Sequence, residues 1–194
     1  MKKKLLSILL VLSLMLALVP AAFAVDIVDS GTCGADGDGS SVTWTLDAAG
    51  LLTISGTGKI ISGDGGSIWS GKPVMAVDIR SGITAVGSNA FYGCDQLQVI
   101  SLPDTVTQLD KNAFGNCAAL SSILVDAKNP AYKSVDGALY SKDGTVLIKC
   151  PADAETFVVP DGVTTIGDYA FFGAKYLTSI YFPEGSLATI GAMA

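Results

Sequence analysis

Two consecutive stretches decide the fold: GITAVGSNAFYGCDQLQVISLPD (residues 82–104) and TVTQLDKNAFGNCAALSSILV (residues 105–125). When they are aligned, alanine–phenylalanine, cysteine and aliphatic positions recur at one constant separation. Phe91 recurs as Phe114 and Cys94 as Cys117, in each case 23 residues later. A fixed period of about 20–50 residues is typical of proteins that stack similar coils. The sequence therefore predicts a solenoid in which each repeat forms one coil.

Each repeat combines one short strand with one tight turn. Leu97, Ile100 and Leu102 are spaced so that their side chains point into the core from a strand, because alternate strand residues face opposite sides. Residues 112–114 are expected to form a single helical or 3₁₀ turn, and Asn116 suits the positive φ that ends such a turn. The fold class predicted is mainly β, with coils of about 23 residues.

A third copy, DGVTTIGDYAFFGAKYLTSIYFP (residues 161–183), follows after an interruption. Its Phe171 lies 57 residues after Phe114, which is one period plus 34 residues. The inserted part, at about residues 130–151, contains Asp136-Gly137 and Asp143-Gly144, and Asp-Gly between apolar runs predicts a β-hairpin. We expect this hairpin to replace the variable side of one coil and to leave the stack of strands continuous.

Residues 1–24 have the pattern of a secretory signal peptide. Three lysines precede an apolar run, and Ala22-Phe23-Ala24 supplies small residues for cleavage. A transmembrane anchor is the alternative, but the run is short for a spanning helix of about 20 residues. We expect an exported protein, secreted or held on the bacterial cell surface, that does not insert into the membrane after cleavage.

Residues 25–73 are predicted to form an N-terminal cap and a loop. Residues 25–41 are rich in Gly and Asp and are expected to be irregular. Val42–Leu46 and Leu51–Ser55 flank a turn and predict a β-hairpin. A solenoid needs a cap over its first coil, and Trp44 is the expected plug, with a Gly/Ser-rich loop bringing Trp69 back to the solenoid.

The solenoid is expected to occupy residues 74–194. The final residues repeat the start of the third copy as far as Ala194, where the next position should be the core phenylalanine. We therefore expect the array to be truncated within its last coil. An uncapped coil that presents Leu187 and Ile190 would favour self-association through the C-terminal edge.

Composition argues against several classes of function. Three of the 12 basic residues fall in the signal peptide, so nine would face 18 acidic residues after cleavage. This balance disfavours nucleic acid as a partner. The sequence has no histidine, which removes the most common general base and zinc ligand. We predict no enzymatic activity, no cofactor and no catalytic or metal site.

One acidic pattern offers an alternative to that prediction. Asp36, Asp38, Ser40 and Asp47 match the spacing of ligands in a calcium loop. However, Ser41 stands where such a loop needs glycine, and the following residues predict a strand.

The disulfide state of the four cysteines is a second question that the sequence leaves open. The third copy has alanine where the other copies have Cys94 and Cys117, which favours small buried thiols over a disulfide. Neighbouring coils are nevertheless close enough for the bond.

The pattern L-x-x-I-x-L-P-x-x-V-x-x-I-G-x-x-A-F-x-x-C, as in residues 97–117 and from Leu177 onward, resembles the BspA-like leucine-rich repeats of bacterial surface proteins. The segments CGADGDGSSVTWTLDAAGLLTISGTG and NPAYKSVDGALYSKDGTVLIKCP also look like companions of these repeats. The resemblance implies a leucine-rich-repeat solenoid and a role in adhesion or in binding an extracellular protein or glycan. The alternative is a structural spacer that presents other domains.

If the repeat sheet binds a partner, its outward positions are the expected contacts. One such position lies between the two inward residues of each strand, as between Ile100 and Leu102. Carried along the repeat, it gives a column of five residues: Asp78, Ser101, Leu124, Val158 and Tyr181. Three of them are apolar or aromatic, which suits a contact surface. The alternative is that the inserted hairpin covers Leu124 and Val158.

Overall fold

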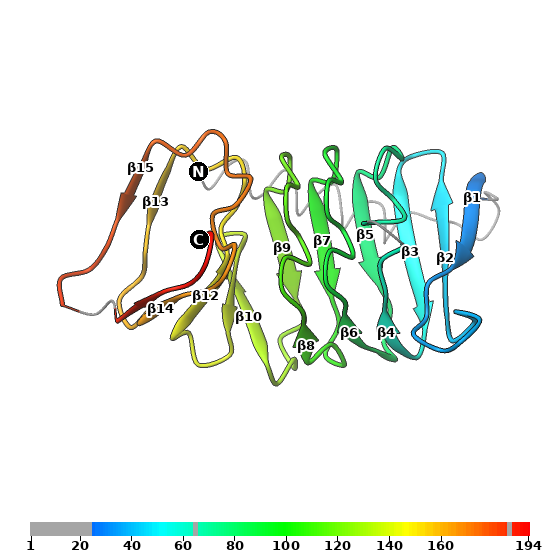
Figure 1. The fold of residues 1–194 in the computed structure, drawn as a ribbon, viewed down its shortest axis with the longest axis horizontal. Coiled ribbons are helices and arrows are strands. Elements are labelled where there is room, and N and C mark those ends of the chain that lie inside the picture. Colours follow the sequence, from blue (N-terminus) through cyan, green and yellow to red (C-terminus); the bar gives the residue numbers. More distant parts are fainter. Residues whose placement is uncertain (1–24, 64–65, 186–187) are drawn as a thin grey trace.

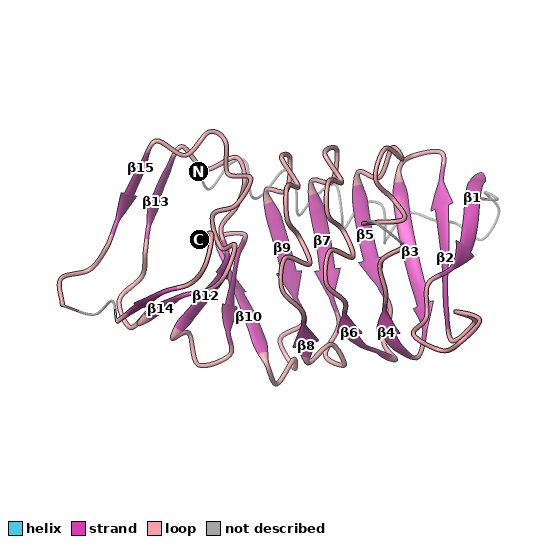
Figure 2. Cartoon of the chain, in the orientation of Figure 1, coloured by secondary structure: helices cyan, strands magenta, loops and turns pink. Residues whose placement is uncertain are grey.

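The computed structural model describes residues 25–63, 66–185 and 188–194. They form a row of coils built from short strands, turns and loops (Figures 1 and 2). No helix is assigned in these ranges, and accordingly none there could cross a membrane. The signal peptide expected at residues 1–24 lies outside the described residues, as does Leu187.

A three-stranded antiparallel sheet begins the structure. It consists of β1 (Ile27–Thr32), β2 (Val42–Asp47) and β3 (Leu51–Gly56). The hairpin expected from the alternating residues forms as β2 and β3. The expectation that residues 25–41 are irregular is wrong for β1. This strand pairs with β2 but buries no side chain, so it leaves no hydrophobic periodicity in the sequence.

The cap closes the core through Trp44, whose side chain is 7% exposed. Its ring meets the ring of Trp69 edge-on, with 6.1 Å between centroids. Gly31 on the neighbouring strand makes room for the indole, because a Cβ at that position would lie 3.0 Å from the Trp44 ring. Trp44 therefore covers the end of the stack, as the plug predicted from the sequence should.

Parallel strands continue the sheet from β3 in strict repeat register. They are β5 (Ala76–Ile79), β7 (Val99–Leu102) and β9 (Ser122–Val125). Ile100 pairs with Val77 on one side and with Ile123 on the other, so the buried aliphatic residues stack directly. The 23-residue spacing seen in the sequence is thus the spacing between neighbouring strands.

A second, smaller ladder runs along another side of the coils. It consists of β4 (Gly58–Ile60), β6 (Ile83–Val86) and β8 (Gln108–Leu109). Next comes a hydrogen-bonded turn in each coil, where a helical turn was expected. Asn89 and Asn112 both have a φ of 57°. This value lies in the left-handed region, so the chain cannot continue there as a right-handed helix. The positive φ expected at Asn116 is confirmed at 54°.

Aromatic rings form a continuous ladder in the centre of the solenoid. Trp69 stacks on Phe91 with 5.0 Å between centroids, and Phe91 stacks on Phe114 at 6.0 Å. Phe91 and Phe114 are buried. Trp69 thus takes the place that phenylalanine holds in the following coils, and Phe171 of the third copy does not join this ladder but meets Phe157.

The insert forms an antiparallel sheet of its own. Its strands are β10 (Tyr132–Val135), β11 (Ala138–Ser141) and β12 (Val146–Lys149). Asp136 and Gly137 join the first two with φ values of 50° and 83°, as a two-residue type I′ turn requires. Just before β10, Asn129 is fully buried, and its side-chain amide donates to the carbonyls of Pro103 and Val106.

The expectation that the insert leaves the strand stack continuous is wrong. The sheet ends at β9, and β13 (Thr156–Val158) pairs only with β15 (Ser179–Tyr181) among the described strands. On the other side, β12 replaces a solenoid strand and pairs in parallel with β14 (Thr165–Ile166), which pairs with β16 (Thr189–Ile190). The buried residues accordingly divide into two clusters, and the division runs through the insert, since Leu139 belongs to the first cluster and Tyr140 to the second.

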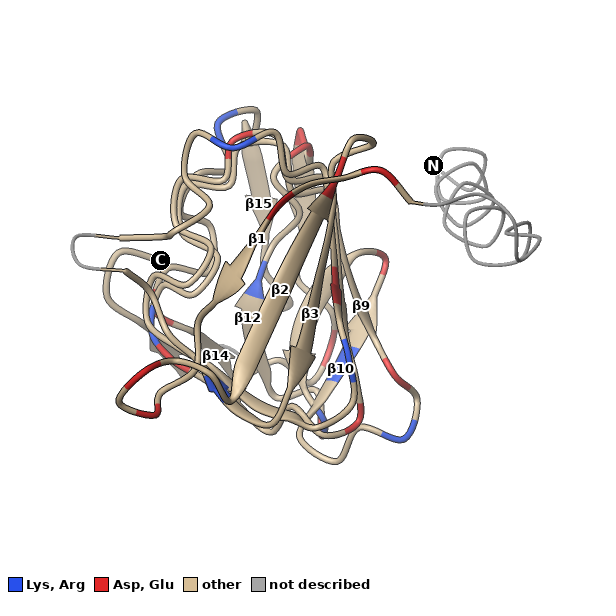
Figure 3. Cartoon of the chain, turned by 90° about the vertical axis from the view of Figure 1, so that its right-hand side faces the viewer, with Lys and Arg blue, Asp and Glu red and all other residues tan. Residues whose placement is uncertain are grey.

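Charged residues lie mainly in loops and turns around the coils (Figure 3). All four cysteines are buried free thiols, with no disulfide among the described residues. The thiol of Cys117 donates a hydrogen bond to the carbonyl of Phe91 at 3.0 Å. Burial raises the pKa of the Cys33, Cys117 and Cys150 thiols from 9.0 to about 12.

The ring ladder leads to a first prediction. Replacing Phe114 with alanine removes a buried ring between Phe91 and the junction with the insert, and should lower the free energy of unfolding by about 3–5 kcal/mol. Urea unfolding followed by circular dichroism measures the change. Tyr176→Ala, at a 54% exposed ring, is the control and should change stability by less than about 1 kcal/mol. A similarly small change for Phe114→Ala would contradict the stacking described.

The buried thiols lead to a second prediction, about alkaline pH. Unfolded thiols ionise near pH 9, whereas the folded thiols stay protonated up to about pH 12. Their contribution to stability is therefore complete below pH 9 and is lost as pH rises toward 12. Cys117→Ala should reduce the slope of stability against pH in this window, measured by urea unfolding. An unchanged slope would contradict the pKa shift of Cys117. The substitution suits this position, because the third copy already has alanine, Ala174, at the equivalent place.

Candidate functional site

The outward face of the strands carries the column predicted from the sequence, but in two separate pieces. Asp78 lies opposite Ser101, and Ser101 lies opposite Leu124, in the continuous sheet. Val158 lies opposite Tyr181 in the two-stranded sheet after the insert. Leu124 and Val158 are therefore not neighbours in one ladder, because the insert separates their strands.

The first piece is polar and tied together by side-chain interactions. The Ser101 hydroxyl donates to the Asp78 carboxylate at 3.1 Å, and Arg80 forms an ion pair with the same carboxylate at 2.9 Å. Thr53 of the cap lies opposite Asp78 and extends this piece. The sequence prediction missed Thr53, although the alternation of threonine with buried residues in the cap strands marks it as outward-facing.

The second piece is apolar and open to solvent. Val158 is 66% exposed and Tyr181 is 60% exposed, so neither is covered by the inserted hairpin. Leu139 and Tyr140 are the large side chains of the inserted hairpin strand β11, and both are buried, one in each of the two core clusters. Leu124 is half-buried. The apolar contact surface that remains consists of Val158 and Tyr181.

The acidic residues near the N-terminus do not assemble into the alternative calcium loop. The Asp36 carboxylate accepts hydrogen bonds from the Ser40 and Ser41 hydroxyls before β2 begins. The hydrogen bond from the Ser41 hydroxyl is the main cause that lowers the pKa of Asp36 to about 2, and the Ser41 backbone amide also donates to this carboxylate and lowers the pKa further. Asp47 lies at the opposite end of β2 and accepts from the amides of the next turn. Each carboxylate therefore organises its own loop.

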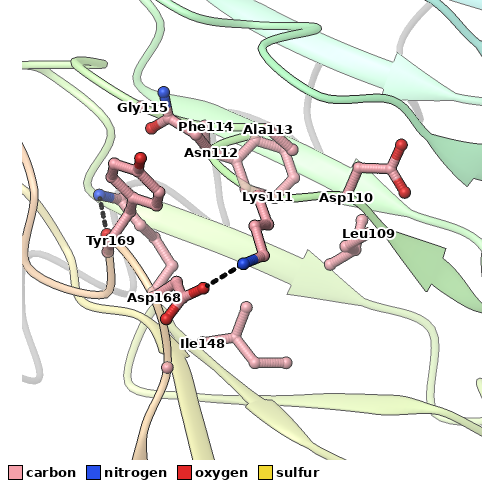
Figure 4. Close-up of a pocket in the computed structure, with 12 residues that line it drawn as sticks. Leu109, Asp110, Lys111, Asn112, Ala113, Phe114, Gly115, Ile148, Asp168 and Tyr169 are labelled. Atoms are coloured by element: carbon pink, nitrogen blue, oxygen red, sulfur yellow. Dashed lines mark hydrogen bonds and ion pairs between the residues drawn. The ribbon is translucent and has the colours of Figure 1, made fainter. Parts of the chain in front are cut away.

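A cavity of about 190 Å³ lies where the insert interrupts the stack. Its walls come from the turn of the second copy, the turn of the third copy and the end of β12. In Figure 4, Lys111 and Phe114 lie on one side and Asp168 and Tyr169 on the other. An ion pair of 3.0 Å between Lys111 and Asp168 joins the two sides.

Lys149 is a buried cation in the wall of this cavity, with 5% of the residue exposed. Its ammonium group donates to the Phe172 carbonyl at 2.5 Å and to the Tyr169 carbonyl at 3.4 Å. Burial lowers the pKa of Lys149. The same ammonium group thus holds the turn of the third copy against the insert. Sequence reasoning missed this cavity, because no periodic signal shows where two coils part.

Searches against known proteins gave several similar solved structures. A leucine-rich repeat protein from Eubacterium ventriosum has 20% identity and a TM-score of 0.47; the match covers 84% of this chain and 62% of that protein. The pneumococcal vaccine antigen PcpA has 17% identity and a TM-score of 0.49, over 87% of this chain and 68% of that protein. A leucine-rich cell surface protein from Faecalibacterium prausnitzii has 19% identity and a TM-score of 0.40, over 84% of this chain and 73% of that protein.

The chain thus spans less than two thirds of the Eubacterium ventriosum protein. No curated protein matched the chain. The family model for the BspA-type leucine-rich repeat region matches six copies, over residues 67–139 and 148–194. These two segments make up more than half of the chain, and they include both the regular coils and the coils after the insert. The chain belongs to the BspA-type leucine-rich repeat family.

Proposed function

We propose that this protein is an exported binding module, secreted or held on the bacterial surface, whose repeat sheet contacts an extracellular protein or glycan. The proposal rests mainly on the exposed pair Val158 and Tyr181, which lie opposite each other on β13 and β15. Neither side chain is buried in the core, so core packing does not account for two large apolar residues at these positions. Tyrosine in particular is enriched among the residues that contribute most to binding interfaces.

The character of the outward face also suits contact with a partner. The exposed apolar pair lies in the sheet after the insert, whereas the polar piece in which Asp78 and Ser101 are hydrogen-bonded lies in the sheet before it. The repeat sheets therefore offer an apolar contact and, separately, a polar one, and protein interfaces use both kinds. The signal-peptide pattern at residues 1–24 supports export, which would bring this face to extracellular ligands.

The third prediction tests the sheet face. The double variant Val158→Ser, Tyr181→Ser should weaken binding to an array of extracellular-matrix proteins and glycans by at least about tenfold, since such contact residues contribute about 1–2 kcal/mol each. The melting temperature should stay nearly constant, because both side chains are already exposed. Val135→Ser, at a residue 45% exposed on the insert, is the control and should bind normally.

Three outcomes would contradict this proposal. Unchanged binding by the double variant would exclude the pair as the contact. The absence of any binding by the original chain would favour the spacer role. A large fall in melting temperature would instead show that Val158 and Tyr181 stabilise the fold.

A further inference from the structure

We propose that the free edge of β13 binds an extended segment of another protein, and that this segment carries lysine or arginine on both sides of an apolar centre. The inference rests on the proposed function, because it concerns the same strands, β13 and β15, and says how they hold a partner. The segment would add a further strand beside β13, as extended peptides do at the open edges of other sheets. Three features of the strand support this: unpaired backbone groups, an uncovered edge and flanking carboxylates.

The backbone of β13 has hydrogen-bonding groups that point away from β15. The Glu155 carbonyl accepts from the amide just before β15, and the Val159 amide donates to the Tyr181 carbonyl. These alternate positions therefore bond toward β15. Successive residues of a strand direct their backbone groups to opposite sides, so the amides and carbonyls of Thr156 and Val158 lie at the other edge. No described strand pairs with that edge.

The fold covers the edge of β9, on the other side of the insert, but leaves that of β13 open. The Ile123 amide of β9 donates to the Gly137 carbonyl at 3.0 Å, so the turn of the inserted hairpin takes part of the place of a next strand. Beyond the pairing with β15, no described residue forms a hydrogen bond with Thr156 or Val158. In Figure 1, β13 and β15 stand apart from the sheet that ends at β9. Since proteins usually cover or block such edges, this one is available to another chain.

Carboxylates on both sides of β13 define the charge of the segment that it would accept. Asp153 and Glu155 precede the strand and Asp161 follows it, and all three residues are exposed. None of them takes part in an ion pair within the described part of the chain. From residue 150 to residue 194, the sequence has five acidic residues and a single lysine. A segment with cations at both ends would therefore meet opposite charges, which favours its association and its specificity.

The centre of the segment is expected to be apolar. Val158 is 66% exposed and lies opposite Tyr181, which is 60% exposed. Side chains of an added strand would lie beside Val158, and cross-strand pairs of β-branched and aromatic residues are stabilising. Glu155 and Asp161 are six positions apart, or about 20 Å in an extended chain at about 3.3 Å per residue. A segment of about seven residues with basic ends would match this edge.

The fourth prediction uses the peptide acetyl-Lys-Lys-Val-Thr-Val-Lys-Lys-amide as a probe. At low ionic strength it should shift the NMR signals of the Thr156 and Val158 amides in the isotope-labelled chain. Titration of these signals measures the dissociation constant. A peptide with glutamate in place of each lysine should bind at least about tenfold more weakly, because its charge is opposite. A peptide methylated on the three central backbone nitrogens keeps the lysines but cannot donate hydrogen bonds to a strand, and should not bind.

Variants of the protein test the same edge. Thr156→Pro removes one amide and places a ring at the edge, and should weaken binding about fivefold or more. Proline is tolerated on an edge strand whose amide faces outward. Thr156→Ala is the matched control, since it keeps the amide and should bind normally. The double variant Glu155→Gln, Asp161→Asn should bind the basic peptide more weakly and with less dependence on salt.

Several results would overturn the proposal. These are no binding of the basic peptide, equal binding of its methylated form, and equal binding of the acidic peptide. A dimer in sedimentation that Thr156→Pro abolishes would also overturn it, because a second copy would then take the edge. Failure of the proposed function looks different, since Val158→Ser, Tyr181→Ser would then leave array binding unchanged. If this double variant loses array binding while the basic peptide fails to bind, the outward face remains the contact and only the edge pairing is excluded.

Discussion

The stacking of equivalent side chains in register is the constraint on which the rest of the structure depends. One coil cannot bury its own apolar residues, so each relies on the coil above and below. Parallel pairing at a spacing of 23 residues places Ile100 between Val77 and Ile123, and the same register stacks Trp69, Phe91 and Phe114. Side-chain polar groups follow the same rule, as the bonded amides of Asn89 and Asn112 show.

The insert shows what happens when this register is interrupted. Its strands complete one side of the coil, because β12 pairs in parallel with β14, but they do not bridge β9 and β13. The core divides into two clusters at the same place. In a regular stack, a polar side chain can bond to the equivalent residue of the next coil. At the junction this partner is missing, and Oδ1 of Asn112 has no hydrogen-bond partner among the described residues. The cavity is thus a direct result of a broken repeat.

The outward sheet face and the cavity at the junction differ in their physical origin. The outward pair of Val158 and Tyr181 follows from strand alternation, which exposes every second residue whatever its polarity. The cavity arises where the insert separates the turns of the second and third copies, so that β12 pairs with β14. Substitutions on the first surface should leave the fold undisturbed, whereas the second is part of the junction that Lys149 holds together.

The sequence by itself determined the coil period, the inward strand residues, the Asp-Gly hairpin and the position of Trp44, because each depends on local spacing or on turn chemistry. The outward column could be listed from the same period. Only the tertiary structure decided that β1 is a strand, that the sheet stops at β9, and that Leu124 and Val158 are apart. β1 buries neither face, so its pairing leaves no mark on side-chain periodicity. The other two features depend on which segments pair across the insert, and that pairing joins residues far apart in the sequence. The cavity was likewise beyond the sequence, since it arises from the distance between two turns that the repeat pattern treats as neighbours.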